Sequence, residues 1–120
     1  MVRTGVDAGE ATDGQYFFVR MTTAMDEIFG ARGTLARYLF GYEPRPGQLE
    51  MAEAVAAVLA DPEQEARLVV EAETGLGKTL AYLVPAVLSG RRVVVSTNTR
   101  NLQDQILQRE IPFIRQYIDP

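Results

Sequence analysis

The feature that most constrains the fold is a glycine-rich segment, Ala-Glu-Thr-Gly-Leu-Gly-Lys-Thr, at residues 72–79. Before it lies an apolar run at 68–72, too short for a helix, which predicts a buried parallel strand. After it, Lys78 to Leu88 has the composition of a helix. Gly75 and Gly77 let the backbone turn its amides inward around an anion. A strand, a glycine turn and a helix in this order predict a phosphate-binding loop.

Two polar residues at the start of the predicted helix supply the chemistry of such a loop. The helix terminus adds about half a positive charge to the ammonium of Lys78, which points to the β- and γ-phosphates of a nucleotide. Each charge-assisted bond is worth about 1.5–3 kcal/mol. The hydroxyl of Thr79 is a hard ligand suited to Mg²⁺. We therefore predict Lys78 and Thr79 as catalytic residues, Thr79 as the magnesium ligand, and an ATP-binding loop of Thr74, Gly75, Leu76, Gly77, Lys78 and Thr79. A turn that merely connects two elements is the alternative, and it leaves Lys78 and Thr79 unexplained.

The rest of the chain alternates in the same way. Residues 93–97 are β-branched and predict a second strand. A helix is expected from Asn101 to about Tyr117, broken or kinked at Pro112. This alternation predicts an α/β fold of the P-loop NTPase class, with a parallel sheet, right-handed crossovers and flanking helices.

The segments before the loop predict helices and one weakly patterned leader. Residues 1–20 have little periodicity and predict a poorly ordered leader, with a small strand at 16–19 as the alternative. Residues 21–120 are expected to form the domain. Within it, helical spacing predicts two short helices around the break at 30–33, and a longer helix from Pro46 to about Leu59.

Composition limits the partners. The formal charge of −4 argues against a strongly basic, nonspecific nucleic-acid binder, although a local groove is compatible with it. Without cysteine or histidine, the chain lacks disulfides and the usual ligands for zinc or iron–sulfur centres. No apolar run is long enough to span a bilayer. We expect a cytoplasmic monomer without membrane contact.

Three segments, 42–50, 71–79 and 96–105, resemble successive motifs of the DinG/XPD-type helicases of superfamily 2, and the resemblance extends over about residues 25 to 110. Ala72 departs from the usual opening glycine and is similar to the helicase form of the loop. The resemblance implies a RecA-like sheet, here an incomplete first helicase domain. It also implies an ATP-dependent DNA helicase that couples hydrolysis to movement along single-stranded DNA in repair or replication.

The resemblance assigns further site residues. Gln48 would read the adenine edge, because an amide both donates and accepts, and Tyr42 and Arg45 would flank the base or order the loop. The alternative for Gln48 is an exposed polar residue on the first helical turn. The residues that would contact single-stranded DNA are Thr97, Asn98, Thr99, Arg100 and Asn101. A helix cap made by Asn98 or Thr99 is the alternative or additional role there.

Part of a complete motor is absent from the sequence. Hydrolysis also needs an acidic pair after a strand and arginines from a second domain. The acidic residues near and after the end of the third motif are Asp104, Glu110 and Asp119. None of them follows an apolar strand. Cysteines for an iron–sulfur cluster would have to come after residue 120. We predict that the 120-residue chain alone does not turn over ATP. The alternatives are a P-loop kinase or transporter ATPase acting on a small substrate, and a non-catalytic nucleotide-binding module.

Overall fold

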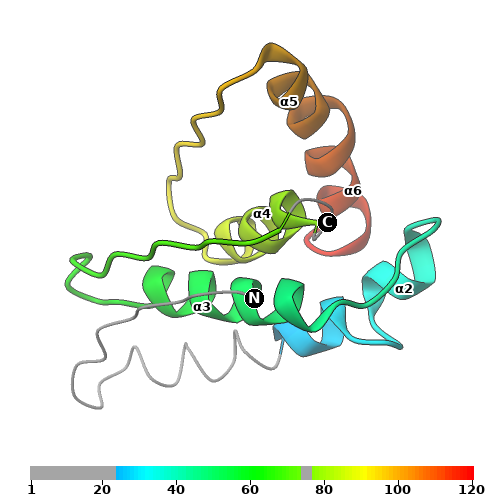
Figure 1. Cartoon of the computed structure of the whole chain (residues 1–120), viewed down its shortest axis with the longest axis horizontal. Helices are drawn as coiled ribbons and strands as arrows, with labels where there is room; N and C mark the ends of the chain where they lie inside the picture. Colours follow the sequence, from blue (N-terminus) through cyan, green and yellow to red (C-terminus); the bar gives the residue numbers. More distant parts are fainter. Residues whose placement is uncertain (1–23, 74–76) are drawn as a thin grey trace.

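The computed structural model describes residues 24–73 and 77–120. The predicted leader at 1–20 and the loop residues Thr74, Gly75 and Leu76 lie outside the described residues. Residues 24–29 are helical, and the other helices are α2 (Thr34–Tyr38), α3 (Pro46–Leu59), α4 (Lys78–Leu88), α5 (Arg100–Gln105), the π-helical turn η1 (Ile106–Glu110) and α6 (Ile111–Tyr117). Figure 1 shows α3 and α4 side by side, with α5 and α6 rising beyond α4.

The core lies where α3 packs against α4 and α4 against η1, and its buried cluster extends to Ile114 of α6. Ala52 and Ala56, one turn apart on α3, and Ala81 on α4 are fully buried. Such small side chains let two helix backbones approach closely. Larger side chains fill the remaining volume, and those that are fully buried include Met25, Phe29, Leu35, Val84 and Ile114. The two short helices and the helix at Pro46–Leu59 predicted from the sequence are confirmed.

The C-terminal helical run shows how the chain accommodates Pro112. Proline lacks an amide hydrogen, and its ring would collide with the carbonyl four residues earlier in a regular helix. The run therefore widens into η1 just before Pro112, which occupies the first turn of α6. The predicted disturbance at Pro112 is confirmed. No helix in the described parts of the chain is both long and apolar enough to cross a membrane.

The predicted parallel sheet is not formed among the described residues. Residues 68–72 and 93–97 are extended, but the only strand feature assigned within 24–73 and 77–120 is an isolated bridge at Glu71. Val69, in the segment predicted as a buried strand, is 83% exposed, and Val94 in the second predicted strand is 89% exposed. A parallel strand forms its hydrogen bonds only with neighbouring strands, so an apolar run without such neighbours stays extended and open to solvent.

The extended segment 93–97 borders a groove on one side of the helical core. Its volume is about 400 Å³, and it opens between α3, α4 and the run 93–97. Its lining is Val55, Leu59, Tyr82, Ala86, Val93, Val94, Val95, Ser96, Thr97 and Leu102.

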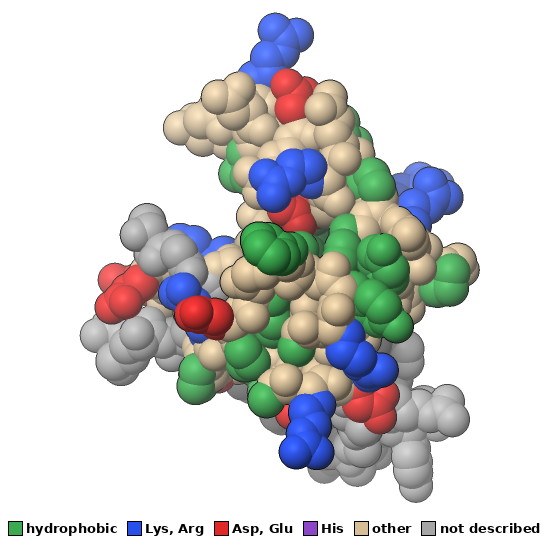
Figure 2. All heavy atoms as spheres, turned by 90° about the vertical axis from the view of Figure 1, so that its right-hand side faces the viewer, with side chains coloured by type: hydrophobic (Ala, Val, Ile, Leu, Met, Phe, Trp, Pro, Cys, Tyr) green, Lys and Arg blue, Asp and Glu red, His purple; other side chains and the backbone are tan. Residues whose placement is uncertain are grey.

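A second contact region joins α2 to α6. The rings of Tyr38 and Tyr117 stack with their centres 4.7 Å apart. The ring of Phe113 is tilted against that of Tyr117, and their centres are 5.0 Å apart. Figure 2 shows this side of the molecule, where hydrophobic side chains gather and charged side chains are scattered around them. The aromatic stack thus ties the early helices to the end of the chain.

Candidate nucleotide-binding site

The site is built around the junction of Gly77 and Lys78. Gly77 precedes α4 with φ +77° and ψ 39°, the left-handed conformation that glycine adopts without strain. Gly77, the N-cap residue of α4, has no side chain with which to cap the helix. Lys78 is the first residue of the helix, and its Nζ donates a hydrogen bond of 3.1 Å to the carbonyl of Ala72. The ammonium therefore reaches back across the loop to the end of the segment predicted as a strand.

Gln48 on the first turn of α3 is bound to this junction. Its side chain is 3% exposed, and its Nε2 donates to the carbonyl of Gly77 at 3.2 Å. The Oε1 accepts a hydrogen bond from the hydroxyl of Tyr42 at 3.0 Å. The interpretation of Gln48 as an exposed polar residue is wrong, because both ends of the amide are engaged in a buried network.

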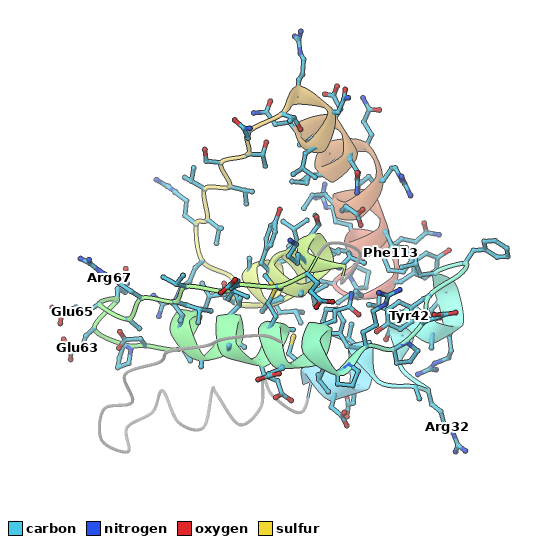
Figure 3. All side chains as sticks on the ribbon, in the orientation of Figure 1. Arg32, Tyr42, Glu63, Glu65, Arg67 and Phe113 are labelled. Carbon is cyan, nitrogen blue, oxygen red and sulfur yellow. The ribbon has the colours of Figure 1, made fainter. Side chains whose placement is uncertain are left out.

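Tyr42 lies on the loop between α2 and α3 and points toward the interior of the molecule, on the side where Phe113 of α6 lies (Figure 3). Its hydroxyl also lies 2.7 Å from the carbonyl oxygen of Phe29, so its single hydrogen is shared between that carbonyl and Oε1 of Gln48. Burial raises the pKa of the Tyr42 phenol above its ordinary value. The hydroxyl therefore keeps its hydrogen at neutral pH and remains a donor.

Arg45, the third upstream residue assigned from the sequence, is not part of this network. Its side chain is exposed. Its carbonyl accepts the amides of Gln48 at 3.0 Å and Leu49 at 3.4 Å, so the backbone of Arg45 starts α3. The structure thus brings Tyr42, Gln48, Gly77 and Lys78 together and leaves Arg45 at the surface.

The residues around Thr79 fit a nucleotide-borne magnesium ion. Thr79 follows Lys78 in the first turn of α4 and is half-buried. No group of three or more carboxylate, imidazole or thiol side chains that could hold a metal occurs in the described ranges. The hydroxyl of Thr79 is a hard oxygen ligand of the kind that Mg²⁺ takes, and Mg²⁺ commonly takes its other ligands from water and substrate phosphates.

The predicted DNA-contacting residues lie at the start of α5, away from the Gly77 junction. Asn98, Thr99, Arg100 and Asn101 are exposed. The Thr99 hydroxyl accepts the amide of Leu102 at 3.3 Å, so the predicted helix cap is present. The hydroxyl of Thr97 donates to the carbonyl of Thr99 at 3.2 Å. Two of the hydroxyls are therefore engaged locally, and the amides of Asn98 and Asn101 and the Arg100 guanidinium lie at the surface.

Comparison with known proteins places the chain in a family. Residues 46–117 match the DEAD/DEAH box helicase family. The chain is 42% identical over 92 residues to a Haemophilus influenzae protein named ATP-dependent DNA helicase YoaA, covering 77% of this chain and 14% of that protein. It is 43% identical over 79 residues to the Salmonella choleraesuis ATP-dependent DNA helicase DinG, covering 62% of this chain and 11% of that protein.

A third relative carries a different name. The Bacillus subtilis 3'-5' exonuclease DinG is 37% identical over 90 residues, covering 72% of this chain and 9% of that protein. No solved structure matches the chain significantly. The chain spans about one seventh or less of the length of these relatives. The family match includes α3, the Gly77–Lys78 junction and the helical run to Tyr117, and the chain therefore belongs to the DEAD/DEAH box helicases, a family with the P-loop NTPase fold.

Proposed function

We propose that this chain is the ATP-gripping part of an ATP-dependent DNA helicase of the DinG/XPD type. The observation that carries the proposal is the left-handed Gly77 directly before Lys78, the first residue of α4. Membership of the DEAD/DEAH box helicases and similarity to proteins named as DNA helicases support the same reading.

Lys78 has a simple route to a phosphate. Its bond to the neutral carbonyl of Ala72 holds the ammonium beside the loop. A phosphate oxygen carries negative charge and accepts a stronger, charge-assisted hydrogen bond than a carbonyl. Replacement of the Ala72 carbonyl by a triphosphate oxygen as the acceptor of the Lys78 ammonium is therefore favourable. The free amides at the start of α4 add donors at the same end of the helix.

Thr79 would hold magnesium, and the bound ion would bridge and neutralise the β- and γ-phosphates. Thr74, Gly75 and Leu76 complete the loop in this proposal. We also propose that Gln48 meets adenine. Its amide has a second Nε2 hydrogen and a second Oε1 lone pair besides those used by Gly77 and Tyr42. Because the side chain is buried, this contact requires the base to reach the free edge of the amide while the bonds to Gly77 and Tyr42 are kept.

The finer architecture belongs to the proposal as well. We infer that residues 68–72 and 93–97 become strands of a RecA-like sheet when paired with further strands. The exposure of Val69 and Val94 supports this, because apolar β-branched side chains are the usual content of buried parallel strands. In that arrangement Thr97 to Asn101 would meet single-stranded DNA through phosphate contacts.

The test is ATP hydrolysis by the complete gene product with and without single-stranded DNA. We expect hydrolysis to be stimulated by the DNA and lost in Lys78→Ala, with strand separation lost in parallel. A matched control is Arg91→Ala, which removes an exposed cation at the other end of α4. Hydrolysis that survives Lys78→Ala, or that ignores DNA, would contradict the proposal.

A further inference from the structure

A chain of hydrogen bonds connects the helical segment 24–29 to the phosphate-binding loop. The Tyr42 hydroxyl lies 2.7 Å from the carbonyl oxygen of Phe29 and 3.0 Å from Oε1 of Gln48. Gln48 continues the chain from Nε2 to the carbonyl of Gly77 at 3.2 Å. The links join positions 13, 6 and 29 residues apart in sequence, so the network is tertiary throughout.

The orientation of the Gln48 amide depends on Tyr42. The Gly77 carbonyl accepts and does not donate, so Nε2 has to face it and Oε1 has to face the opposite way. Oε1 then lies in a side chain that is 3% exposed, where an acceptor without a donor is costly. The Tyr42 hydroxyl supplies that donor by sharing its single hydrogen between Oε1 of Gln48 and the carbonyl of Phe29, a residue that is itself 2% exposed.

At the last link of this hydrogen-bond network, Gly77 and the Gln48 side chain are in close contact. A β-carbon added at Gly77 would collide with Nε2 of Gln48. Gly77 also fixes the direction in which α4 begins, and Lys78 is the next residue. A displacement of the Gln48 amide therefore acts on Gly77, whose next residue along the backbone is Lys78.

We propose that Tyr42 is a positioning residue for the phosphate-binding loop, acting through the Gln48 amide on Gly77. This inference rests on the proposed function, because it assumes that the loop binds a triphosphate. It differs from base recognition in one respect. A residue that positions the loop changes the affinity for the phosphate chain itself, whether or not a base is attached.

The experiment uses the 120-residue chain and calorimetric titration with Mg·ATP and, separately, with Mg·tripolyphosphate, which has no base. Tyr42→Phe removes the hydroxyl and keeps the ring. We expect it to weaken both ligands by the same factor, about threefold to tenfold, the worth of one hydrogen bond. Tyr38→Phe, which removes an exposed hydroxyl on α2, should leave both affinities unchanged.

Two further variants separate positioning from a general loss of stability. Gln48→Ala should weaken tripolyphosphate, and Tyr42→Phe added to Gln48→Ala should cause no further loss, because Tyr42 then has no amide to hold. Gln48→Glu keeps an acceptor for Tyr42 but has no hydrogen for Gly77, and it should weaken tripolyphosphate as Gln48→Ala does.

Several outcomes would overturn the inference. Tyr42→Phe could weaken ATP but not tripolyphosphate, which would make Tyr42 a base contact. Its effect could persist in the Gln48→Ala background, which would place its action elsewhere. Binding that depends on Lys78 but ignores Tyr42→Phe overturns this inference alone, whereas an unaltered chain that binds neither ligand overturns the proposed function and the inference with it.

Discussion

The Gln48 side chain and the Gly77 carbonyl, 29 residues apart in sequence, are joined by a 3.2 Å hydrogen bond inside the protein. The bond links the first turn of α3 to the residue before α4. The conformation at the end of the loop therefore depends on the packing of α3 against α4 as well as on the loop itself. Gly77 is left-handed at this point, so both its backbone angle and its contact with Gln48 exclude a side chain.

Gly77→Ala should therefore cost more stability than the backbone angle alone explains. A left-handed non-glycine residue costs about 1–2 kcal/mol. The collision of the added methyl group with Nε2 of Gln48 comes on top of that cost. We expect Gly77→Ala to lower the free energy of unfolding, measured by urea denaturation, and to weaken Mg·ATP binding.

Gly90 provides the matched control for this substitution. It lies just after α4, has φ +67°, and an added β-carbon there meets nothing within 4 Å. Gly90→Ala should show the backbone cost alone, about 1–2 kcal/mol, and unchanged affinity for ATP. Adding Gln48→Ala to Gly77→Ala should remove the excess over Gly90→Ala. Equal losses for the two glycine variants would disprove a steric role for Gln48.

Glu53 on α3 should give the protein a pH dependence in the acid range. Burial raises the pKa of Glu53, and the neighbouring carboxylates of Asp26 and Glu50 raise it further. The folded state therefore holds the proton more tightly than the unfolded chain, and stability falls as the pH rises from the ordinary glutamate pKa through the raised one. Glu53→Gln should stabilise the protein at neutral pH and make little difference below that window.

Thermal melts at a series of pH values measure this difference. Glu63→Gln is the control, because Glu63 is an exposed glutamate in the turn after α3. A gain in melting temperature for Glu53→Gln that is as large at low pH as at neutral pH would exclude a charge effect.

Asp61 organises the turn that follows α3. Its carboxylate accepts the amides of Ala66 at 2.7 Å, Glu65 at 2.9 Å and Glu63 at 3.1 Å. These bonds, with that from Ala66 foremost, hold the pKa of Asp61 below its ordinary value. The turn should keep its order above the ordinary aspartate pKa and lose it as the pH falls through the lowered one.

Amide hydrogen exchange at Ala66 reports on this turn. Asp61→Ala should accelerate that exchange at neutral pH, and Asp104→Ala, at an exposed aspartate of α5, should not. Unchanged protection of the Ala66 amide in Asp61→Ala would show that the turn does not depend on the carboxylate.

Local sequence pattern predicted the helices because their causes are local. Pro46, Lys78 and Pro112 each lie at or near a helix start, where fixed backbone geometry or unpaired amides suit them, and the structure agrees. The buried face of α3 was predicted less well. The pattern does not indicate that the polar Gln48 is buried, because the partner of α3 selects the face that is buried.

The features that the sequence did not predict correctly depend on residues distant in the chain. The strands at 68–72 and 93–97 have the right composition, but hydrogen-bonded neighbours decide whether a strand forms, and composition does not supply them. The network from Phe29 to Gly77 could not be found either. The resemblance assigns Tyr42 and Gln48 to a base, and nothing in their spacing indicates a contact with a carbonyl 29 residues after Gln48.

The chain alone should bind ATP without hydrolysing it. Hydrolysis needs a carboxylate that positions magnesium and water. Asp104 and Asp119 are exposed, and Glu110 accepts a 3.0 Å hydrogen bond from the Gln105 amide. Release of phosphate by the purified chain at a rate above that of Lys78→Ala would contradict this expectation.

The most direct test of the triphosphate site uses the fact that Lys78 is the only lysine among the 120 residues. An acylating reagent therefore has one ε-amine to modify. Mass spectrometry of the peptide that contains Lys78 measures the rate of its acylation. We predict that saturating Mg·ATP or Mg·tripolyphosphate slows acylation of Lys78 at least tenfold, whereas Mg²⁺ with adenosine does not. If Lys78 reacts at the same rate with and without the triphosphates, the ammonium does not hold a phosphate chain and the central claim is wrong.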